Sequence, residues 1–183
     1  MEKIFFSSEG IARIIGKNGL MKKKIEKNLD IKIKKNEDDS LMIDSKDKVE
    51  EFLLRYFLDA ITLGFPFNIA MSLIKSDKIF KQIDIKNFSK NPSRIDVIKS
   101  RVIGKEGKAK KTISYLTATD IMIKENFIGI IGEAENVHSA EEAFLKIIRG
   151  APHAHVYKFL ESEQKRRKEI EAELEEFRRK IKK

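Results

Sequence analysis

The sequence predicts an α+β protein made of two copies of one small domain, followed by a long C-terminal helix. The main observation is a motif that occurs twice, at residues 13–19 (Arg-Ile-Ile-Gly-Lys-Asn-Gly) and at 101–107 (Arg-Val-Ile-Gly-Lys-Glu-Gly). The second copy lies 88 residues after the first, and the same offset aligns Ile25 with Ile113. Each motif separates two helical patterns and precedes two short alternating runs that are typical of strands. The chain is therefore an internal duplication.

In the first half, apolar spacing and turn residues predict a β-α-α-β-β-α order. Ser8 is the expected N-cap of the first helix, and Gly64 is the expected end of the last one. The residues between the two hairpin strands form an acidic loop, residues 36–40. The expected elements are a strand at 3–7, helices at 8–15 and 20–28, strands at 31–33 and 41–43, and a helix at 47–63.

The second half repeats this order after a short packed helix with Pro66 at its first turn. The expected elements are a strand at 81–88, helices from 92 and at 108–116, strands at 120–124 and 128–131, and a helix at 136–149. The whole chain is therefore expected to have four parts: a first domain at 1–64, a helical linker at 65–77, a second domain at 78–150 and a C-terminal helix at 151–183.

The C-terminal helix changes character along its length. Val156 and Leu160 are apolar and are expected to dock on the second domain, whereas residues 164–169 are almost wholly charged. Beyond them, apolar residues recur at steps of four, three and four, as in a short heptad seam. These residues are Ile170, Leu174, Phe177 and Ile181. The pattern is compatible with either packing within the chain or a partner helix.

Composition narrows the classes of function. The formal net charge of +9 favours a polyanionic partner, and the positive charge is concentrated around the second motif. The chain has no cysteine, which excludes disulfides, thiolate zinc sites and cysteine nucleophiles. No apolar run is long enough to span a bilayer, and residues 1–6 are too short and mixed for a secretory signal. We expect a cytoplasmic protein with no membrane partner.

A Gly-x-x-Gly turn between two helices suits single-stranded nucleic acid, because glycines let backbone N–H groups approach a phosphate chain closely. Lysines next to the turns supply the field, and isoleucines would line an apolar cleft for bases. Glu106 fits poorly, since its carboxylate would repel phosphate unless it turns away or accepts from a base amino group. Arg13 and Arg101 suit either bases or phosphates. The expected RNA-binding residues of the second copy are Arg101, Ile103, Gly104, Lys105, Glu106, Gly107, Lys108, Lys110, Lys111, Ile121 and Ile123; those of the first are Arg13, Ile15, Gly16, Lys17, Asn18, Gly19, Lys22, Lys23, Ile31 and Ile33.

The sequence gives little support for a nucleotide-binding loop or a metal site. A nucleotide-binding P-loop is rejected, because five residues instead of four separate Gly10 from Gly16 and Asn18 stands where Ser or Thr should hold magnesium. The three histidines are too few and too scattered for a metal site. Residues 37–39 (Glu-Asp-Asp) could hold a metal for phosphodiester cleavage, but consecutive loop carboxylates usually face solvent. We therefore expect no enzyme, no metal and no cofactor.

The β-α-α-β-β-α order with its Gly-x-x-Gly turn resembles the type I KH domain, here in two tandem copies. Residues 1–161 as a whole are similar to archaeal members of the Pno/Dim family of ribosome assembly factors. The resemblance rests on the tandem spacing and on residues 63–70, 91–94 and 150–161 (Gly-Ala-Pro-His-Ala-His-Val-Tyr-Lys-Phe-Leu-Glu). It implies a non-enzymatic protein that binds the 3′ region of small-subunit rRNA. It also implies a Nob-type endonuclease and the alpha subunit of the second translation initiation factor as partners.

The main hypothesis is thus a monomeric tandem KH protein that binds single-stranded rRNA during small-subunit assembly. Its rival is a scaffold in which only the second domain binds RNA, while the first domain or the C-terminal helix docks a nuclease or an initiation factor. A nuclease that uses the acidic loop and a messenger-binding regulator are further alternatives.

Overall fold

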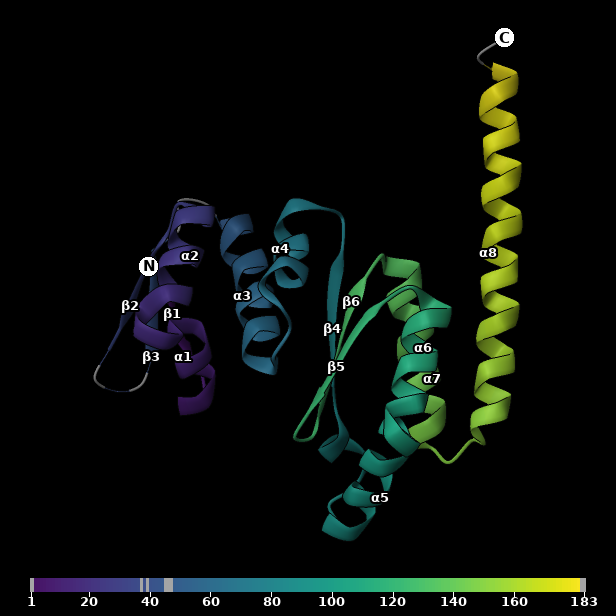
Figure 1. Cartoon of the computed structure of the whole chain (residues 1–183), viewed down its shortest axis with the longest axis horizontal. Coiled ribbons are helices and arrows are strands. Elements are labelled where there is room, and N and C mark those ends of the chain that lie inside the picture. The colour runs from purple at the N-terminus through teal and green to yellow at the C-terminus, as the bar shows by residue number, and fades with distance from the viewer. Residues whose placement is uncertain (1, 37, 39, 45–47, 182–183) are drawn as a thin grey trace. The chain divides into compact units, whose positions relative to one another are not determined.

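Each half of the chain folds as the expected β-α-α-β-β-α series (Figure 1). The computed structural model describes residues 2–36, 38, 40–44 and 48–181. The first series is β1 (Glu2–Phe5), α1 (Ser8–Ile15), α2 (Leu20–Leu29), β2 (Lys32–Lys35), β3 (Ser40–Asp44) and α3 (Lys48–Leu63). After α4 (Phe67–Lys75), the second is β4 (Ile79–Asp84), α5 (Pro92–Ile103), α6 (Lys108–Thr117), β5 (Asp120–Lys124), β6 (Phe127–Gly132) and α7 (Ala134–Ile148). The chain then continues into α8 (His153–Ile181).

The first sheet has the order β1-β3-β2, with β3 antiparallel to both neighbours. Alternate residues of the strands face the core, as the period of two requires. Ile4 pairs with Leu41 and Ile33 pairs with Ile43, and all four side chains are buried. Helices α1 and α3 pack against each other and bury Ile14, Phe57 and other apolar side chains.

The N-cap of α1 lies one residue earlier than expected, although the helix spans the expected residues. Ser7, not Ser8, is the N-cap, and its hydroxyl accepts a hydrogen bond from the N–H of Gly10 at 3.2 Å. Both serines suit the cap by type, and only the backbone decides between them. The short helix α4 packs on α3, where the rings of Phe57 and Phe67 meet edge to face at 5.8 Å.

The second sheet has the order β4-β6-β5. Its central strand β6 is buried from Ile128 to Gly132, because neighbours flank it on both edges and α7 contacts it. The expected strand at 81–88 is too long. β4 ends at Asp84, whose carboxylate accepts from the N–H of Lys86 at 2.8 Å and starts a 3₁₀ turn at Ile85–Phe88. The expected α+β class and the two three-stranded antiparallel sheets are thus confirmed.

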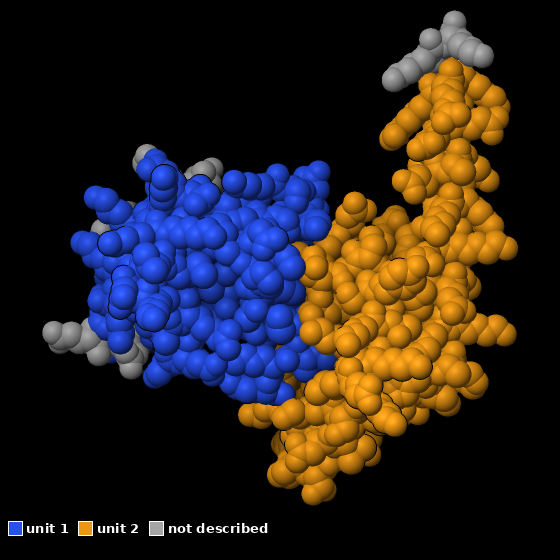
Figure 2. Space-filling model, viewed as in Figure 1, with its two compact units in different colours: residues 1–80, 122–125 blue, residues 81–121, 126–183 orange. Residues whose placement is uncertain are grey.

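The chain divides into two compact units (Figure 2). Unit 1 comprises residues 1–80 and 122–125, and unit 2 comprises residues 81–121 and 126–183. Helix α4 therefore belongs to unit 1 and α8 to unit 2. The finer boundaries at residues 64, 77 and 150 stay predictions.

Helix α8 packs on α6 and α7 only along its first half. Val156 and Leu160 are fully buried there, whereas every described residue from Lys168 to Ile181 is exposed. Figure 1 shows the last turns of the helix beyond the ends of α6 and α7. No helix in the described part of the chain is long and apolar enough to cross a membrane.

Candidate nucleic-acid interface

The two Gly-x-x-Gly turns have nearly the same backbone. The first glycine has φ 69° and ψ 175° at Gly16, and φ 73° and ψ 169° at Gly104. A Cβ atom at Gly104 would lie 2.7 Å from the backbone nitrogen of Ala109, and at Gly16 it would lie 2.6 Å from the Cβ of Met21. Glycine is required at this position both for its positive φ and for the space.

The third residue of each turn is left-handed, although it is not glycine. Asn18 has φ 53° and Glu106 has φ 54°. Asn adopts this conformation readily, whereas a glutamate there is strained by about 1 kcal/mol. Both side chains are exposed. Glu106 therefore occupies a place in the turn that its residue type does not favour.

Hydrogen bonds close each turn and leave donors between the glycines. The N–H of Gly104 donates to the carbonyl of Ser100 at 2.9 Å, and that of Gly107 donates to Gly104 at 3.1 Å. These bonds do not use the N–H groups of Lys105 and Glu106. Helix α6 starts immediately after the turn, so its positive dipole end adds to these donors. The arrangement suits a phosphate.

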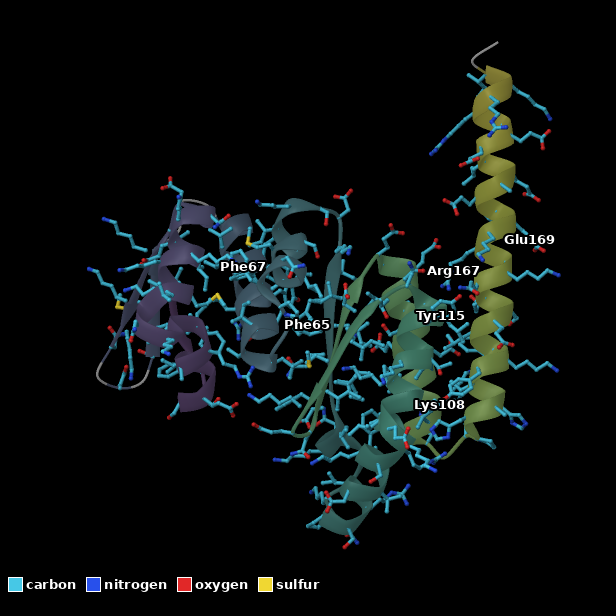
Figure 3. All side chains as sticks on the ribbon, in the orientation of Figure 1. Phe65, Phe67, Lys108, Tyr115, Arg167 and Glu169 are labelled. Carbon is cyan, nitrogen blue, oxygen red and sulfur yellow. The ribbon has the colours of Figure 1, made fainter. Side chains whose placement is uncertain are left out.

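Most of the expected lysines surround the turns with their side chains in solvent. Lys17 and Lys23 of unit 1 are exposed, as are Lys105, Lys108 and Lys111 of unit 2. Lys22 and Lys110 are half-buried. Figure 3 shows Lys108 at the start of α6, next to the turn. The positive field that the sequence predicted is therefore present at both turns.

Unit 1 has a pocket of about 330 Å³ beside its turn. It brings together five of the ten expected residues, from the turn, α1, α2 and β2. The other five do not line it, namely Arg13, Gly16, Lys17, Asn18 and Ile31. It also contains three residues that the sequence did not indicate. The expected residues are Ile15, Gly19, Lys22, Lys23 and Ile33; the additional ones are Glu26, Lys35 and Leu41.

Glu26 changes what this pocket can bind. Its Oε1 accepts a hydrogen bond from the N–H of Ile33 at 2.9 Å, and it lies 3.9 Å from the Nζ of Lys22. Because β2 is an edge strand, this N–H is one that a base could otherwise use. A carboxylate in the groove also repels phosphate. Only the hydrogen-bond geometry reveals this residue.

In unit 2 the residue 88 positions after Glu26 is Ser114. Its hydroxyl donates to the carbonyl of Thr119 at 2.5 Å, so no carboxylate stands at this place. Of the three isoleucines expected to line the cleft, Ile103 is 38% exposed, Ile123 is half-buried and Ile121 is 6% exposed. Ile121 is thus mainly a core residue, as Ile31 is in unit 1 at 7%.

The arginine before each turn has a structural partner. Arg101 is half-buried, and its Nη2 donates to the carbonyl of Ala151 at 2.7 Å. A contact of this guanidinium with RNA would have to use its other N–H groups. Arg13 is exposed and pairs instead with Glu9 of the same helix at 3.2 Å. The sequence could not indicate the Arg101 contact, because its acceptor is a backbone carbonyl 50 residues away.

The stretch Gly-Ala-Pro-His at 150–153 joins α8 to the last turn of α5. The Nε2 of His153 lies 2.9 Å from the carbonyl oxygen of Arg101, which can only accept, so this nitrogen carries the hydrogen. One turn later, burial raises the pKa of the Tyr157 hydroxyl, and its hydrogen bond to Thr112 of α6 partly offsets that rise. We call the contacts of Arg101, Ala151 and His153 the α5–α8 clamp.

Tyr115 is an exposed aromatic residue that the sequence pattern does not single out. It is 78% exposed on α6, four residues after Lys111 and seven after Lys108, and Figure 3 shows it on the same helix as Lys108. Spacings of four and seven residues place the three side chains on one face of the helix. An aromatic ring among lysines is a surface on which a base can stack.

The structure describes only part of the acidic loop. Glu37 and Asp39 lie outside the described residues, and Asp38 accepts from the hydroxyl of Ser40 at 2.5 Å. Within the described residues, no group of three His, Asp or Glu side chains could hold a metal ion.

Residues 79–165 match the family described as "Eukaryotic type KH-domain (KH-domain type I)", in its form for the second KH domain of PNO1. The chain is 36% identical over 178 residues to the KH domain-containing protein MJ0443 of Methanocaldococcus jannaschii, which covers 95% of this chain and 78% of that protein. It is 31% identical to the pre-rRNA-processing protein pno1 of Emericella nidulans over 62% of this chain. The chain spans less than half the length of such PNO1 relatives.

Among solved structures, the chain is similar to Dim2p of Pyrococcus horikoshii in its complex with a/eIF2alpha and rRNA. The TM-score is 0.79 at 26% identity, over 90% of this chain and 93% of that one. The expected resemblance to Pno and Dim proteins is therefore confirmed.

Proposed function

We propose that this chain, which belongs to the family of archaeal KH-domain proteins related to the Pno1 and Dim2 pre-rRNA-processing factors, binds single-stranded rRNA of the small ribosomal subunit. The family is non-catalytic, which agrees with the expectation that the chain is not an enzyme. The Dim2p relative was solved together with rRNA and a/eIF2alpha. We extend both partners to this chain, and we place its site of action in the cytoplasm.

The observation that carries the proposal is the turn of unit 2. Its glycines have the backbone that a close phosphate contact needs, and α6 begins directly after the turn with three lysines among its first four residues. These lysines are Lys108, Lys110 and Lys111. The turn also lies inside the residues that match the PNO1 KH domain.

In this proposal the bound strand lies with its backbone on the turn and its bases over the neighbouring apolar residues. Lys105 and the N–H groups of the turn contact phosphate, while Ile103 contacts bases. In unit 1, Lys17, Asn18 and the pocket around Ile15 and Ile33 would hold a second stretch of RNA. Binding by two linked units raises the overall affinity without any new contact.

The 3′ region of small-subunit rRNA is the proposed target within this class, and a Nob-type endonuclease is the proposed neighbour on it. If the 3′ region is the target, the chain must bind that RNA sequence more tightly than other sequences. A comparison of affinities for the two kinds of RNA tests this directly.

Glu26 favours a second reading of unit 1. Because its carboxylate takes the N–H of Ile33 and stands in the groove, unit 1 is less suited to RNA than unit 2. In that reading only unit 2 binds RNA, and unit 1 or α8 docks a nuclease or the initiation factor.

The test is the binding of a labelled single strand from the 3′ end of the organism's small-subunit rRNA, measured by fluorescence anisotropy. One variant carries Lys105→Asp with Glu106→Asp, and another carries Lys17→Asp with Asn18→Asp. Lys90→Asp, an exposed change of the same charge as the first variant, is the control. A scrambled strand measures specificity.

We expect at least a tenfold loss for the unit 2 variant, and less than a twofold change for the control. If both units bind RNA, the unit 1 variant should also lose affinity; if only unit 2 binds RNA, it should not. Binding by both units should also steepen the salt dependence, by about 0.7 for each additional phosphate contact. Unchanged affinity in both turn variants would show that the turns are not the RNA site.

A further inference from the structure

The end of α8 carries an apolar stripe that the RNA-binding proposal does not use. Ile170, Leu174, Phe177 and Ile181 are 48%, 50%, 61% and 68% exposed. Their steps of four, three and four residues place them on one helix face. Four large apolar side chains on a single face are more than an isolated solvated helix needs.

This stripe continues the face by which α8 packs on unit 2. Going back in steps of three and four from Ile170, the same face carries Arg167, Leu160 and Val156. Leu160 and Val156 are fully buried, and Arg167 donates to the hydroxyl of Ser139 at 2.9 Å. The packing face of α8 is therefore longer than the surface of α6 and α7 that covers it. Figure 3 shows Arg167 beside α6, with Glu169 on the part of α8 beyond it.

A groove of about 610 Å³ opens where the covered part ends. Ile170 and Leu174 form one wall, and Leu116 and Ala134 contribute from α6 and α7. Two carboxylates, Glu133 and Glu135, stand at the start of α7 in the same groove. Arg167, Lys168 and Arg178 of α8 also line the groove, so it carries charges of both signs beside its apolar side chains.

Charges beside the stripe indicate what covers it. In heptad terms, Glu171 and Glu173 flank its first half, and Arg178 and Lys180 flank its second half. In an antiparallel pair of this segment with itself, Glu171 lies opposite Arg178 and Glu173 lies opposite Lys180 of the other copy. Apolar layers then pair Ile170 with Ile181 and Leu174 with Phe177.

We propose that the end of α8 binds the same segment of a second copy of this chain in antiparallel order. A parallel pair is excluded, because α6 and α7 occupy the same helix face a few turns earlier and the two bodies would collide. In the antiparallel pair, the basic end of each helix reaches the groove of the other copy near Glu133 and Glu135. The inference replaces the monomer expected from the sequence and is independent of the RNA-binding proposal.

The ion pairs within this part of α8 do not prevent the formation of ion pairs with the second copy. Glu175 pairs with Arg179 at 3.6 Å and Glu176 pairs with Lys180 at 2.7 Å, all four side chains being largely exposed. Exposed pairs within one helix contribute little to stability, so Lys180 can change partner. The interface is short, and interfaces below about 1,200 Å² are typically weak.

The experiment is sedimentation equilibrium of the full chain, after ribonuclease treatment, from micromolar to near-millimolar concentration. The expected weight-average mass rises from the 21.2 kDa of one chain towards twice that value. Leu174→Arg should weaken the association at least tenfold, because it places a charge in the central layer. Ala172→Arg, an exposed change on the opposite face of α8, should leave it unchanged.

Two charge-reversal variants test the order of the helices. One carries Glu171→Lys with Glu173→Lys, and the other carries Arg178→Glu with Lys180→Glu. Each alone should stay monomeric, and an equimolar mixture should associate as the wild type does; circular dichroism checks that α8 stays helical. A wild type that remains at 21.2 kDa throughout overturns the proposal. So do association that survives Leu174→Arg and a mixture that stays monomeric.

Discussion

The two Gly-x-x-Gly turns share one backbone but have different surroundings. The φ and ψ angles of Gly16 and Gly104 differ by only a few degrees, and both turns continue into a helix of ten residues. Around the unit 1 turn, however, Leu20 stands where unit 2 has Lys108, and Glu26 stands where unit 2 has Ser114. Duplication has kept the turn and changed the side chains that decide what it binds.

The helices that close the two units differ in a similar way. Counting back from Gly64 and Gly150, Asp59 of α3 corresponds to Leu145 of α7. Burial raises the pKa of the Asp59 carboxyl to about 6, against the opposing effect of Arg55. Unit 2 also has the α5–α8 clamp, whereas the partner of Arg13 within the described residues is Glu9 of its own helix. The two arginines therefore have different partners, since Glu9 in turn pairs with Lys124 at 2.9 Å.

Replacing the first glycine of a turn should have the largest effect. In Gly104→Ala the new Cβ meets the backbone of Ala109, which cannot move aside as a flexible side chain can, so we expect a loss of about 3 kcal/mol in the free energy of unfolding. In Gly107→Ala the new Cβ meets the flexible side chain of Lys111 at an ordinary contact distance of 3.9 Å, so the loss should be only about 1 kcal/mol, owing to the positive φ. Urea denaturation measures both, and equal losses would contradict the steric argument.

Breaking the clamp should come next. Arg101→Ala removes a charged donor from the carbonyl of Ala151 and should lower the stability of unit 2 by about 2 kcal/mol. The matched change Arg13→Ala removes an exposed pair and should lower that of unit 1 by less than about 1 kcal/mol. Hydrogen exchange measured by mass spectrometry separates the units. If Arg101→Ala and Arg13→Ala lowered stability by the same amount, the α5–α8 clamp would not be a stabilising contact specific to unit 2.

Asp59 should make the stability of unit 1 depend on pH. Its pKa rises from 3.8 in the unfolded chain to about 6 in the folded one, so between these values the folded state binds more protons. Its contribution therefore favours folding below pH 3.8 and is lost as the pH rises through about 6. Asp59→Leu should remove this dependence and, at neutral pH, add on the order of 1 kcal/mol after solvent screening. The measurement is the melting temperature of the wild type and of Asp59→Leu from pH 4 to 7. If both proteins showed the same change with pH, the Asp59 carboxyl would not be responsible for it.

Exchanging the groove residues should change RNA binding in opposite directions. Glu26→Gln keeps an acceptor for the N–H of Ile33 but removes the charge, so we expect about threefold tighter binding by unit 1. It is measured in a chain whose unit 2 turn carries Lys105→Asp. Ser114→Glu should weaken binding by unit 2 by a similar factor. Were both changes neutral, the charge in the groove would not explain the difference between the units.

The smallest expected effect concerns the third residue of the turn. Glu106→Asn gives unit 2 the residue of unit 1 in a left-handed conformation, and should raise stability by about 0.5 to 1 kcal/mol. Asn18→Glu should lower that of unit 1 by about as much. A thermal melt of each variant is sufficient, and a loss of stability on Glu106→Asn would mean that the carboxylate has a contact of its own.

The sequence predicts the fold well because its signals are local. The repeated turn, the heptad steps of α8 and the glycines that end α3 and α7 act through neighbouring residues, and most elements lie within a few residues of their expected bounds. Where the prediction missed, the deciding partner was distant or was a backbone group. Ser7 and Ser8 are equal by type, the strand at 81–88 is cut by the Asp84 turn, and Ile121 is buried by the rest of its sheet.

The candidate site divides along the same line. The turns and their lysines could be predicted because residue type alone indicates the backbone freedom of glycine and the positive charge of lysine. The roles of Arg101 and Glu26 could not, since a carbonyl acceptor 50 residues away and a strand N–H leave no mark in residue type. Tyr115 reads as an ordinary helix residue until its exposure is known.

The α5–α8 clamp has a consequence for how unit 2 opens. The last turn of α5 holds the start of α8 through one guanidinium and one carbonyl, and the same turn ends at Gly104. Fraying of α8 from its first turn therefore frees Arg101, three residues before Gly104, and disorder in the Gly-x-x-Gly turn releases α8. The two segments should exchange their amide hydrogens at a common rate, as one cooperative opening.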